Sequence, residues 1–206
     1  MQQAFWAKNL AVESPDTLLI LQHSPIYTIG RSGKLENLLV SSDELAQIGA
    51  QVYFTDRGGD ITYHGPGQLV AYPIINLRKR AKDVHGYVHD LEEVVIRTLA
   101  DFSIEAYRDD KFIGVWVGDD KIAAIGVRIS KWVTMHGLAL NVNPSLDYFS
   151  CINPCGIVEK GVTSIARVLS YDVSVEEVAS SLIENFSRVF MTRIERVVNG
   201  ASGSCL

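Results

Sequence analysis

Cysteine, basic side chains and long apolar runs are all scarce in this sequence. Only three of its 206 residues are cysteines, which excludes a secreted scaffold held by disulfides and indicates a reducing compartment. A chain of this length buries enough surface to form a core without disulfides or a structural metal. We therefore expect one domain at residues 1–198, followed by a flexible tail at residues 199–206.

The sequence also lacks an excess of positive charge and lacks apolar segments long enough to cross a membrane. The chain has 19 lysines and arginines against 24 aspartates and glutamates, a net charge of -5, and this balance gives no electrostatic attraction for nucleic acid or an anionic membrane. Apolar stretches such as residues 18–21 and 122–125 fall far short of the about 20 residues that cross a bilayer. Residues 1–6 lack the features of a signal or transit peptide. These absences predict a cytoplasmic protein without nucleic-acid or membrane partners.

Helical and strand patterns along the chain predict an α+β (α/β) domain in which helices pack on a mixed or antiparallel sheet. A helix of about 20 residues is expected at 84–102, where apolar side chains recur every three or four positions. Capping boxes at 41–44 and 174–177 predict the starts of two more helices. Strands are expected at 17–21, 26–29, 51–55, 68–77, 115–117, 121–130 and 132–142. A helix in the first dozen residues has nothing before it to pack on, so we expect the domain to begin slightly earlier.

The first segment that could carry chemistry is residues 57–67, RGGDITYHGPG. Its glycines allow the backbone to adopt positive φ and to approach a ligand closely. A glycine-rich hairpin turn explains the composition equally well. The spacing matches neither a Walker A loop nor a dinucleotide fingerprint.

The second candidate is Cys155, between a proline and a glycine in INPCG. This loop would present a thiol near backbone N–H groups that can stabilise an oxyanion, although a free cysteine is more often a small buried apolar residue. Cys151 precedes it by four residues, a spacing that suits neither a redox pair nor a zinc site. Cys205 lies in the expected tail. We therefore expect no metal site.

A thiol with the ordinary pKa of about 8.5 needs a basic partner to react at neutral pH. Three residues are available, and their spacing does not choose among them. Lys121 begins the expected strand at 121–130, where partial burial would let its amine accept the thiol proton; a solvated lysine paired with Asp119 or Asp120 is the simpler alternative. His64 and His136 could each pair with the thiol, and His136 could equally be a core histidine.

Two further features have simpler explanations than a functional site. His85 and His89 have the i, i+4 spacing of metal ligands, but no glutamate of an HExxH pattern accompanies them, and an exposed helix face explains them. Residues 78–82 (RKRAK) form the only basic run. Such a run is usually a solvated loop, and it could also dock an acidic partner.

Four segments in this order resemble one known family. Residues 57–64 (RGGDITYH), 121–126 (KIAAIG), 136–141 (HGLALN) and 153–156 (NPCG) together resemble the octanoyltransferases of lipoate biosynthesis, the lipoyl(octanoyl) transferase family. The resemblance extends from about residue 17 to the last expected helix, while the first strand and part of the first helix of the family are missing. It implies the biotin/lipoate protein ligase type of fold.

The resemblance also implies the roles of individual residues. Cys155 would be the acyl-thioester nucleophile and Lys121 the group that lowers its pKa, with His136 as a supporting residue. Small side chains near the substrate would leave room for a medium-length acyl chain. The substrate contacts implied by the family fall on Arg57, Gly58, Gly59, Asp60, Ile61, Thr62, Tyr63, His64, Ala124, Ile125, Gly126, Gly137, Leu138 and Ala139.

The implied reaction transfers an octanoyl group from acyl carrier protein to a lysine of a lipoyl domain. The acceptors would be the glycine-cleavage H protein or the E2 subunits of 2-oxoacid dehydrogenases. Neither ATP, a metal nor another cofactor is expected, because one thioester is exchanged for another. The alternatives are an ATP-dependent lipoate or biotin ligase, which would need no cysteine, and an inactive protein that only binds acyl carrier protein.

Overall fold

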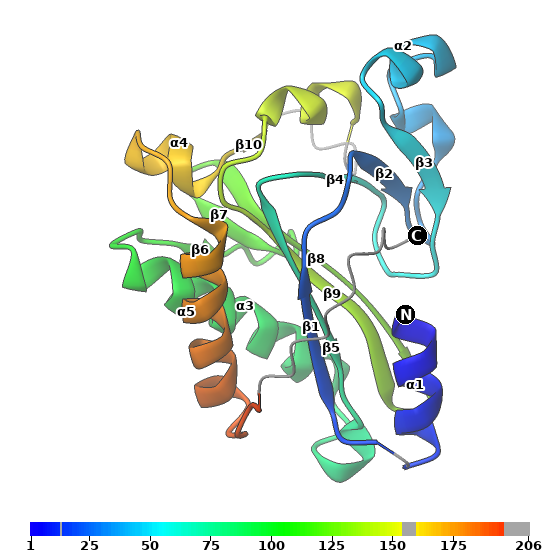
Figure 1. The fold of residues 1–206 in the computed structure, drawn as a ribbon, viewed down its shortest axis with the longest axis vertical. Coiled ribbons are helices and arrows are strands. Elements are labelled where there is room, and N and C mark those ends of the chain that lie inside the picture. The colour runs from blue at the N-terminus through cyan, green and yellow to red at the C-terminus, as the bar shows by residue number, and fades with distance from the viewer. Residues whose placement is uncertain (13, 154–159, 196–206) are drawn as a thin grey trace.

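Two β-sheets form the framework of the molecule, one of seven strands and one of three. The computed structural model describes residues 1–12, 14–153 and 160–195. In Figure 1, helices flank the larger sheet on both sides, and the smaller sheet lies beyond one end of it. The predicted α+β architecture with a mixed sheet is confirmed, while the division of the strands between two sheets is a feature that the strand patterns did not reveal.

The larger sheet is antiparallel along the path β1-β5-β9-β8-β7-β6, and a short strand, β10, joins β8 in parallel. The hairpin of β8 and β9 is its longest pair, and it turns at Lys131 and Trp132, both with positive φ. Such two-residue turns match the right-handed twist of the flanking strands. The strands are β1 (Thr17–Leu21), β5 (Gln68–Ile74), β6 (Tyr107–Arg108), β7 (Val115–Val117), β8 (Asp120–Ser130), β9 (Val133–Asn141) and β10 (Gly161–Val162).

Helices cover the two faces of this sheet unequally. The two longest helices pack against each other and share one apolar core with the sheet, while the first helix packs on β9 and β5 from the other side (Figure 1). The predicted long helix is confirmed, although Val84 at its start is exposed. The Ser174 hydroxyl caps the last helix by accepting from the Glu177 N–H. The helices are α1 (Gln2–Leu10), α3 (Val84–Asp101), α4 (Ile165–Leu169) and α5 (Val175–Val189), with the 3₁₀ turn η2 (Leu77–Lys79) before α3.

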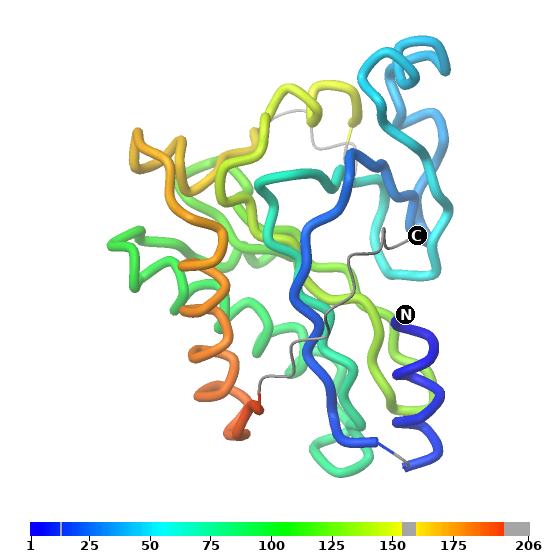
Figure 2. The backbone as a smooth tube through the Cα atoms, viewed as in Figure 1, coloured from blue at the N-terminus to red at the C-terminus, as the bar shows by residue number. Residues whose placement is uncertain are grey.

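The smaller sheet has its own core. Its central strand β2 pairs in parallel with β3 and antiparallel with β4. The core contains Tyr27 and Tyr63 and is completed from far along the chain by Ile152. Figure 2 allows the chain to be followed from β9 back toward this sheet, where Leu38 and Ile152 form a bridge. The elements are β2 (Ile26–Ile29), η1 (Leu35–Asn37), α2 (Ser42–Gln47, with the predicted capping box), β3 (Gln51–Phe54), β4 (Ile61–His64) and η3 (Leu146–Cys151).

Three local expectations differ from the structure. The strand expected at 68–77 ends at Ile74, because the Asn76 side chain accepts from the Arg78 N–H and starts η2. The strand at 17–21 forms as expected, but its apolar run predicts a buried strand, and it is half-buried because it lies at the edge of the larger sheet. Helix α4 was not expected, since five residues are too few to show a helical period. No helix in the described ranges is long and apolar enough to span a membrane.

Candidate active site

A large cavity lies between the two sheets. It has a volume of about 1530 Å³ and is lined by β2, β3 and β4 on one side and by β8 and β9 on the other. Residues from three of the four sequence motifs line it, from Lys121 at the start of β8 to His136 on β9. Cys155 lies outside the described residues. The cavity therefore brings together most of the residues that the sequence singled out.

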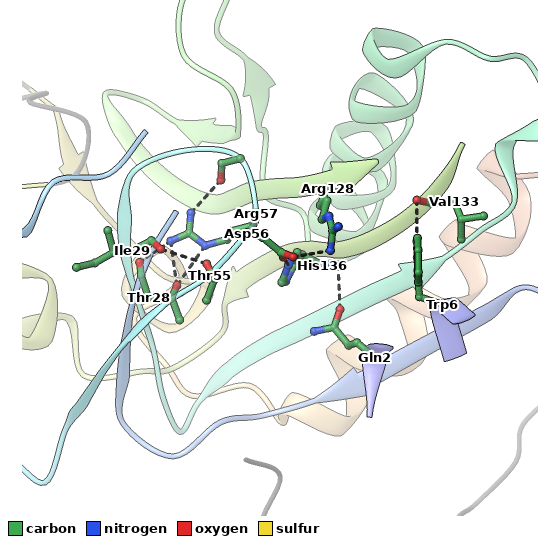
Figure 3. Close-up of polar contacts among 11 residues, drawn as sticks. Gln2, Trp6, Thr28, Ile29, Thr55, Asp56, Arg57, Arg128, Val133 and His136 are labelled. Carbon is green, nitrogen blue, oxygen red and sulfur yellow. Dashed lines mark hydrogen bonds and ion pairs between the residues drawn. The ribbon is translucent and has the colours of Figure 1, made fainter. Parts of the chain in front are cut away.

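The glycine-rich segment forms one wall, and Arg57 holds its backbone. The guanidinium of Arg57 is buried and donates to the carbonyl and the hydroxyl of Thr28 on β2. It also donates to the Gly58 carbonyl (3.0 Å), while the Gly58 N–H donates to the Val127 carbonyl on β8 (2.9 Å). Arg57 and Gly58 thus connect the smaller sheet to the larger one, and Figure 3 shows the Arg57 side chain directed at Thr28.

Residues 60–64 divide between the cavity and the smaller core. The Asp60 carboxylate accepts from the Ile61 N–H (2.7 Å) and the Asn37 amide (2.6 Å). Tyr63 is 1 % exposed and stacks on Tyr148 at 4.6 Å, so it packs in the smaller core instead of lining the cavity. Thr62 and His64 alternate with it and line the cavity. Gly59, Asp60 and Ile61 contribute to the same lining.

His64 takes part in a hydrogen-bond chain that fixes its tautomer. Gln68 uses its amide nitrogen to donate to the Tyr63 carbonyl (3.2 Å) and to Asn141 Oδ1 (2.9 Å). Its oxygen therefore accepts from the Nδ1–H of His64 (2.7 Å), which leaves a lone pair on Nε2. Burial lowers the pKa of His64 to about 3, against the opposing effect of the Gln68 hydrogen bond, so the ring is neutral near pH 7.

The same chain continues to the strand that carries the candidate lysine. The Asn141 amide donates to the Thr163 carbonyl (3.0 Å), and the Thr163 N–H donates to the Lys121 carbonyl (3.0 Å). Two motifs that are far apart in the sequence, at 57–64 and 121–126, are thereby joined through buried side chains. The linking residues Gln68 and Asn141 were not identified as site residues from the sequence, although Asn141 ends the 136–141 motif.

Lys121 is half-buried at one end of the cavity. Its Nζ donates to the Ile113 carbonyl (3.1 Å) and lies 4.8 Å from the ring centroid of Trp116. The Nζ of Lys160 lies 4.4 Å from the same ring centroid and pairs with the Asp109 carboxylate at 2.6 Å. Lys121 is therefore held against an aromatic ring instead of extending into solvent.

Two different structural constraints explain why small residues occur on β8 and β9. A Cβ at Gly126 would lie 3.0 Å from the Gly58 oxygen, so this glycine allows the glycine-rich segment to lie on β8. A Cβ at Gly137 would lie 2.2 Å from the Ala71 oxygen, so that glycine allows β5 to approach β9. Ala124 and Ala139 face each other across the β8–β9 ladder and line the cavity. Ile125 and Leu138 also contribute to the lining but pack mainly with the larger core.

His136 lies at the other end of the cavity with an unusual backbone. Its φ of 58° is left-handed, a conformation that is costly for a residue other than glycine and is often found at functional sites. Its Nε2 donates to the Asp56 carboxylate (2.7 Å), which also pairs with Arg128 (Figure 3). Burial lowers the pKa of His136, although Asp56 opposes the shift. The ring is thus neutral near pH 7, and Asp56 is its partner, a residue that the sequence analysis did not identify.

The secondary candidates lie in ordinary surroundings. His85 and His89 are exposed on α3 and contribute to the cavity lining, and no cluster of three potential metal ligands occurs among the described residues. Cys151 is half-buried at the end of η3. In the basic run, the Arg78 side chain donates to the Leu10 carbonyl and the Arg80 side chain to the Phe190 carbonyl. Both arginines therefore help to hold the chain together.

Known proteins share both the sequence and the fold. The sequence model of the lipoyl protein ligase A/B catalytic domain matches residues 1–187. A protein named octanoyltransferase from Caldicellulosiruptor saccharolyticus is 50% identical over 192 residues, which cover 92% of this chain and 82% of that one. Another of the same name from Caldanaerobacter subterraneus subsp. tengcongensis is 52% identical over 186 residues, covering 90% and 81%.

A solved structure described as lipoate-protein ligase A bound with ATP shares the fold, with a TM-score of 0.74 at 18% identity over 96% of this chain and 84% of that one. The expected biotin/lipoate protein ligase type of fold is therefore confirmed. The family match and the relatives at about half identity agree with the motif-based resemblance. The chain belongs to the lipoyl protein ligase A/B catalytic domain family, among whose members it is similar to the octanoyltransferases.

Proposed function

We propose that this octanoyltransferase carries the octanoyl group on Cys155 as a thioester, with Lys121 as the base and acid. The donor is octanoyl-acyl carrier protein, and the acceptor is a lysine of a lipoyl domain, such as that of the glycine-cleavage H protein or a 2-oxoacid dehydrogenase E2 subunit. The observation that carries the proposal is the position of Lys121 at one end of a cavity that is also lined by residues of the motifs at 57–64 and 136–141.

The surroundings of Lys121 support its role as a proton carrier. The Ile113 carbonyl accepts one of its hydrogens (3.1 Å), and the Trp116 ring limits where the amine can move. Lys160 lies only five residues after Cys155 and contacts the same ring.

The proposed reaction has two half-reactions. The Cys155 thiol gives its proton to the Lys121 amine, and the thiolate attacks the donor thioester; the carrier thiol leaves and takes up the proton. The amine of the target lysine then attacks the acyl-enzyme, Lys121 accepts a proton from that amine, and the Cys155 thiol is regenerated as the amide forms. A thioester is exchanged for a thioester and then for a more stable amide, so no ATP is consumed.

An ATP-dependent ligase is the second candidate, because a structural neighbour is a lipoate-protein ligase with bound ATP. A ligase activates a free acid as an adenylate and has no need of a cysteine. The two mechanisms differ in the acyl donor and in the covalent intermediate, so one assay separates them.

The test is the intact mass of the protein after mixing with octanoyl-acyl carrier protein without ATP. We expect a hydroxylamine-labile octanoyl adduct that is absent in Cys155→Ala and present in the matched control Cys151→Ala. An adduct that survives Cys155→Ala would refute the assigned nucleophile. Octanoylation of a lipoyl domain that requires octanoate and ATP would instead establish a ligase.

A further inference from the structure

One peptide group beside Lys121 is hydrogen-bonded at both of its polar atoms. The Ile113 carbonyl accepts from Lys121 Nζ (3.1 Å), and the Gly114 N–H, which belongs to the same peptide group, donates to the Glu92 carboxylate (3.0 Å). The atoms of a peptide group are coplanar, so a bond that fixes the N–H also fixes the direction of the carbonyl. Glu92 is therefore linked to the proposed proton carrier through one rigid group.

The loop that contains this peptide group is held by polar contacts. It connects β6 to β7, and the Ile113 side chain is 59 % exposed, so packing of that side chain does not anchor it. The Asp109 carboxylate accepts from the N–H groups of residues 111 and 112, which fixes the first half of the loop. The Glu92 carboxylate fixes the second half, at the 113–114 peptide group.

Gly114 allows this loop to lie directly against Lys121. Its φ is 130°, and a Cβ there would lie 2.7 Å from the Ala123 oxygen and 3.2 Å from Lys121 Cε. Glycine is the residue that tolerates such a conformation and such a close approach. A shift of the loop would therefore displace the lysine side chain that lies against it.

Glu92 is a charged residue in an unusual place. It lies in the middle of α3, is 8 % exposed and lines the cavity, although carboxylates are rarely buried to this extent without a partner. Its second oxygen lies 3.4 Å from Arg108 Nε. The neighbouring Glu93 pairs with the same arginine, and of the two it is Glu92 that accepts from the Gly114 N–H. The bond to Gly114 therefore distinguishes Glu92 from a simple partner of Arg108.

The charges around Trp116 show what Glu92 contributes to Lys121. Two ammonium groups contact the Trp116 ring, Lys121 Nζ at 4.8 Å and Lys160 Nζ at 4.4 Å from its centroid. The Asp109 carboxylate pairs directly with Lys160 (2.6 Å). Glu92 acts on Lys121 through the peptide group, and hydrogen bonds to a charged acceptor are strong and reinforce the next bond of a chain.

We propose that Glu92 is a positioning residue for acyl transfer, which holds the Ile113 carbonyl in the place where it keeps Lys121 Nζ at the end of the cavity. This inference rests on the proposed function, because it takes Lys121 as the proton carrier. Proton transfer requires the two groups to lie within hydrogen-bond reach. A displaced amine therefore slows the chemical step and leaves binding of the donor unchanged. Glu92 acts through Lys121 and exchanges no proton itself.

Three variants test the role of Glu92 in acyl-enzyme formation. Glu92→Ala removes the acceptor of the Gly114 N–H, Glu92→Gln keeps an oxygen that can accept from it, and the matched control Glu93→Gln alters the neighbouring partner of Arg108. Acyl-enzyme formation is followed by intact mass at several concentrations of octanoyl-acyl carrier protein. We expect Glu92→Ala to lower the maximal rate about two- to tenfold, the range of one hydrogen bond, with KM unchanged. Glu92→Gln should recover most of the rate, and Glu93→Gln should change neither quantity.

A second measurement reports on Lys121 without any acyl transfer. Trace labelling with acetic anhydride, read by peptide mass spectrometry, gives the reactivity of Lys121 relative to the exposed Lys34. In Glu92→Ala this ratio should rise about two- to tenfold, because the amine is then held less firmly at the Ile113 carbonyl. In Glu92→Gln and Glu93→Gln the ratio should stay close to that of the unmodified protein.

The outcomes separate this role from a structural one. Unchanged maximal rate and labelling in Glu92→Ala, a change in KM alone, or an equal loss in Glu93→Gln would overturn the assignment. Equal losses in Glu92→Ala and Glu92→Gln would also overturn it, since the glutamine retains the acceptor. Absence of an acyl-enzyme in the unmodified protein would refute the proposed function, while the labelling ratio would still decide whether Glu92 positions Lys121.

Discussion

The neutral imidazole of His64 makes a quantitative prediction about stability. An unfolded histidine has a pKa of about 6.5, whereas burial lowers the pKa of His64 in the folded protein to about 3. As the pH falls, the unfolded chain takes up the proton first, so the free energy of unfolding decreases. The contribution of His64 is complete above pH 6.5 and is lost as the pH falls toward 3. Between pH 7 and pH 5, linkage gives a loss of about 2 kcal/mol.

The assay is equilibrium unfolding in urea at pH 7 and pH 5 for the unmodified protein and for His64→Gln. Glutamine does not titrate, so the variant should lose about 2 kcal/mol less stability over this interval. His23 and His136 are present in both proteins, and their contributions cancel in the comparison. His85→Gln, which alters an exposed ring, should behave like the unmodified protein. Equal losses in the unmodified protein and His64→Gln would refute the buried neutral tautomer.

Three further predictions follow from single contacts. Gly137→Ala places a Cβ 2.2 Å from the Ala71 oxygen. We therefore expect the variant to be destabilised by at least about 1–3 kcal/mol, which a lower Tm would show. An unchanged Tm would contradict the close approach of β5 to β9. Ala124→Leu adds volume to the cavity lining and should shift the preferred donor from octanoyl toward hexanoyl thioesters in a rate comparison, whereas an unchanged ratio would exclude Ala124 from the acyl site. Arg78→Glu removes the donor to the Leu10 carbonyl and should lower the free energy of unfolding in urea by about 1 kcal/mol. A higher KM for the acidic carrier protein with unchanged stability would instead support a docking role for residues 78–82.

Local features of the fold could be predicted because they depend on neighbouring residues. The capping box at Ser41 and the cap at Ser174 start helices where the sequence indicates. The apolar periodicity predicts the ends of α3 to within one residue of those in the structure. The antiparallel pairing of β7 with β8 across the turn at Gly118 follows from turn chemistry and strand pattern. The division into two sheets depends instead on pairing between distant residues, such as Leu38 with Ile152, which no local pattern contains.

The candidate site was predictable in its residue types but less so in their contacts. Strand alternation would place His136 on the same face as Leu138, which packs in the larger core. The left-handed backbone at His136 turns the ring toward Asp56 instead, and nothing in the identity of a histidine indicates a positive φ. Likewise, the small size of Gly126 suggests room for a ligand, whereas the structure uses that room for the approach of Gly58.

The closure of the smaller core by Ile152 has a consequence for the order of folding. The Tyr27 hydroxyl donates to the Tyr148 carbonyl, 121 residues later (2.8 Å), and Tyr63 stacks on the same residue. Contacts of such long sequence separation form slowly and late. During synthesis, β2, β3 and β4 leave the ribosome long before η3 can cover their aromatic side chains. The cavity between the sheets should therefore be among the last parts to mature, and amides of β2 should gain protection from hydrogen exchange after those of α3 in a refolding experiment.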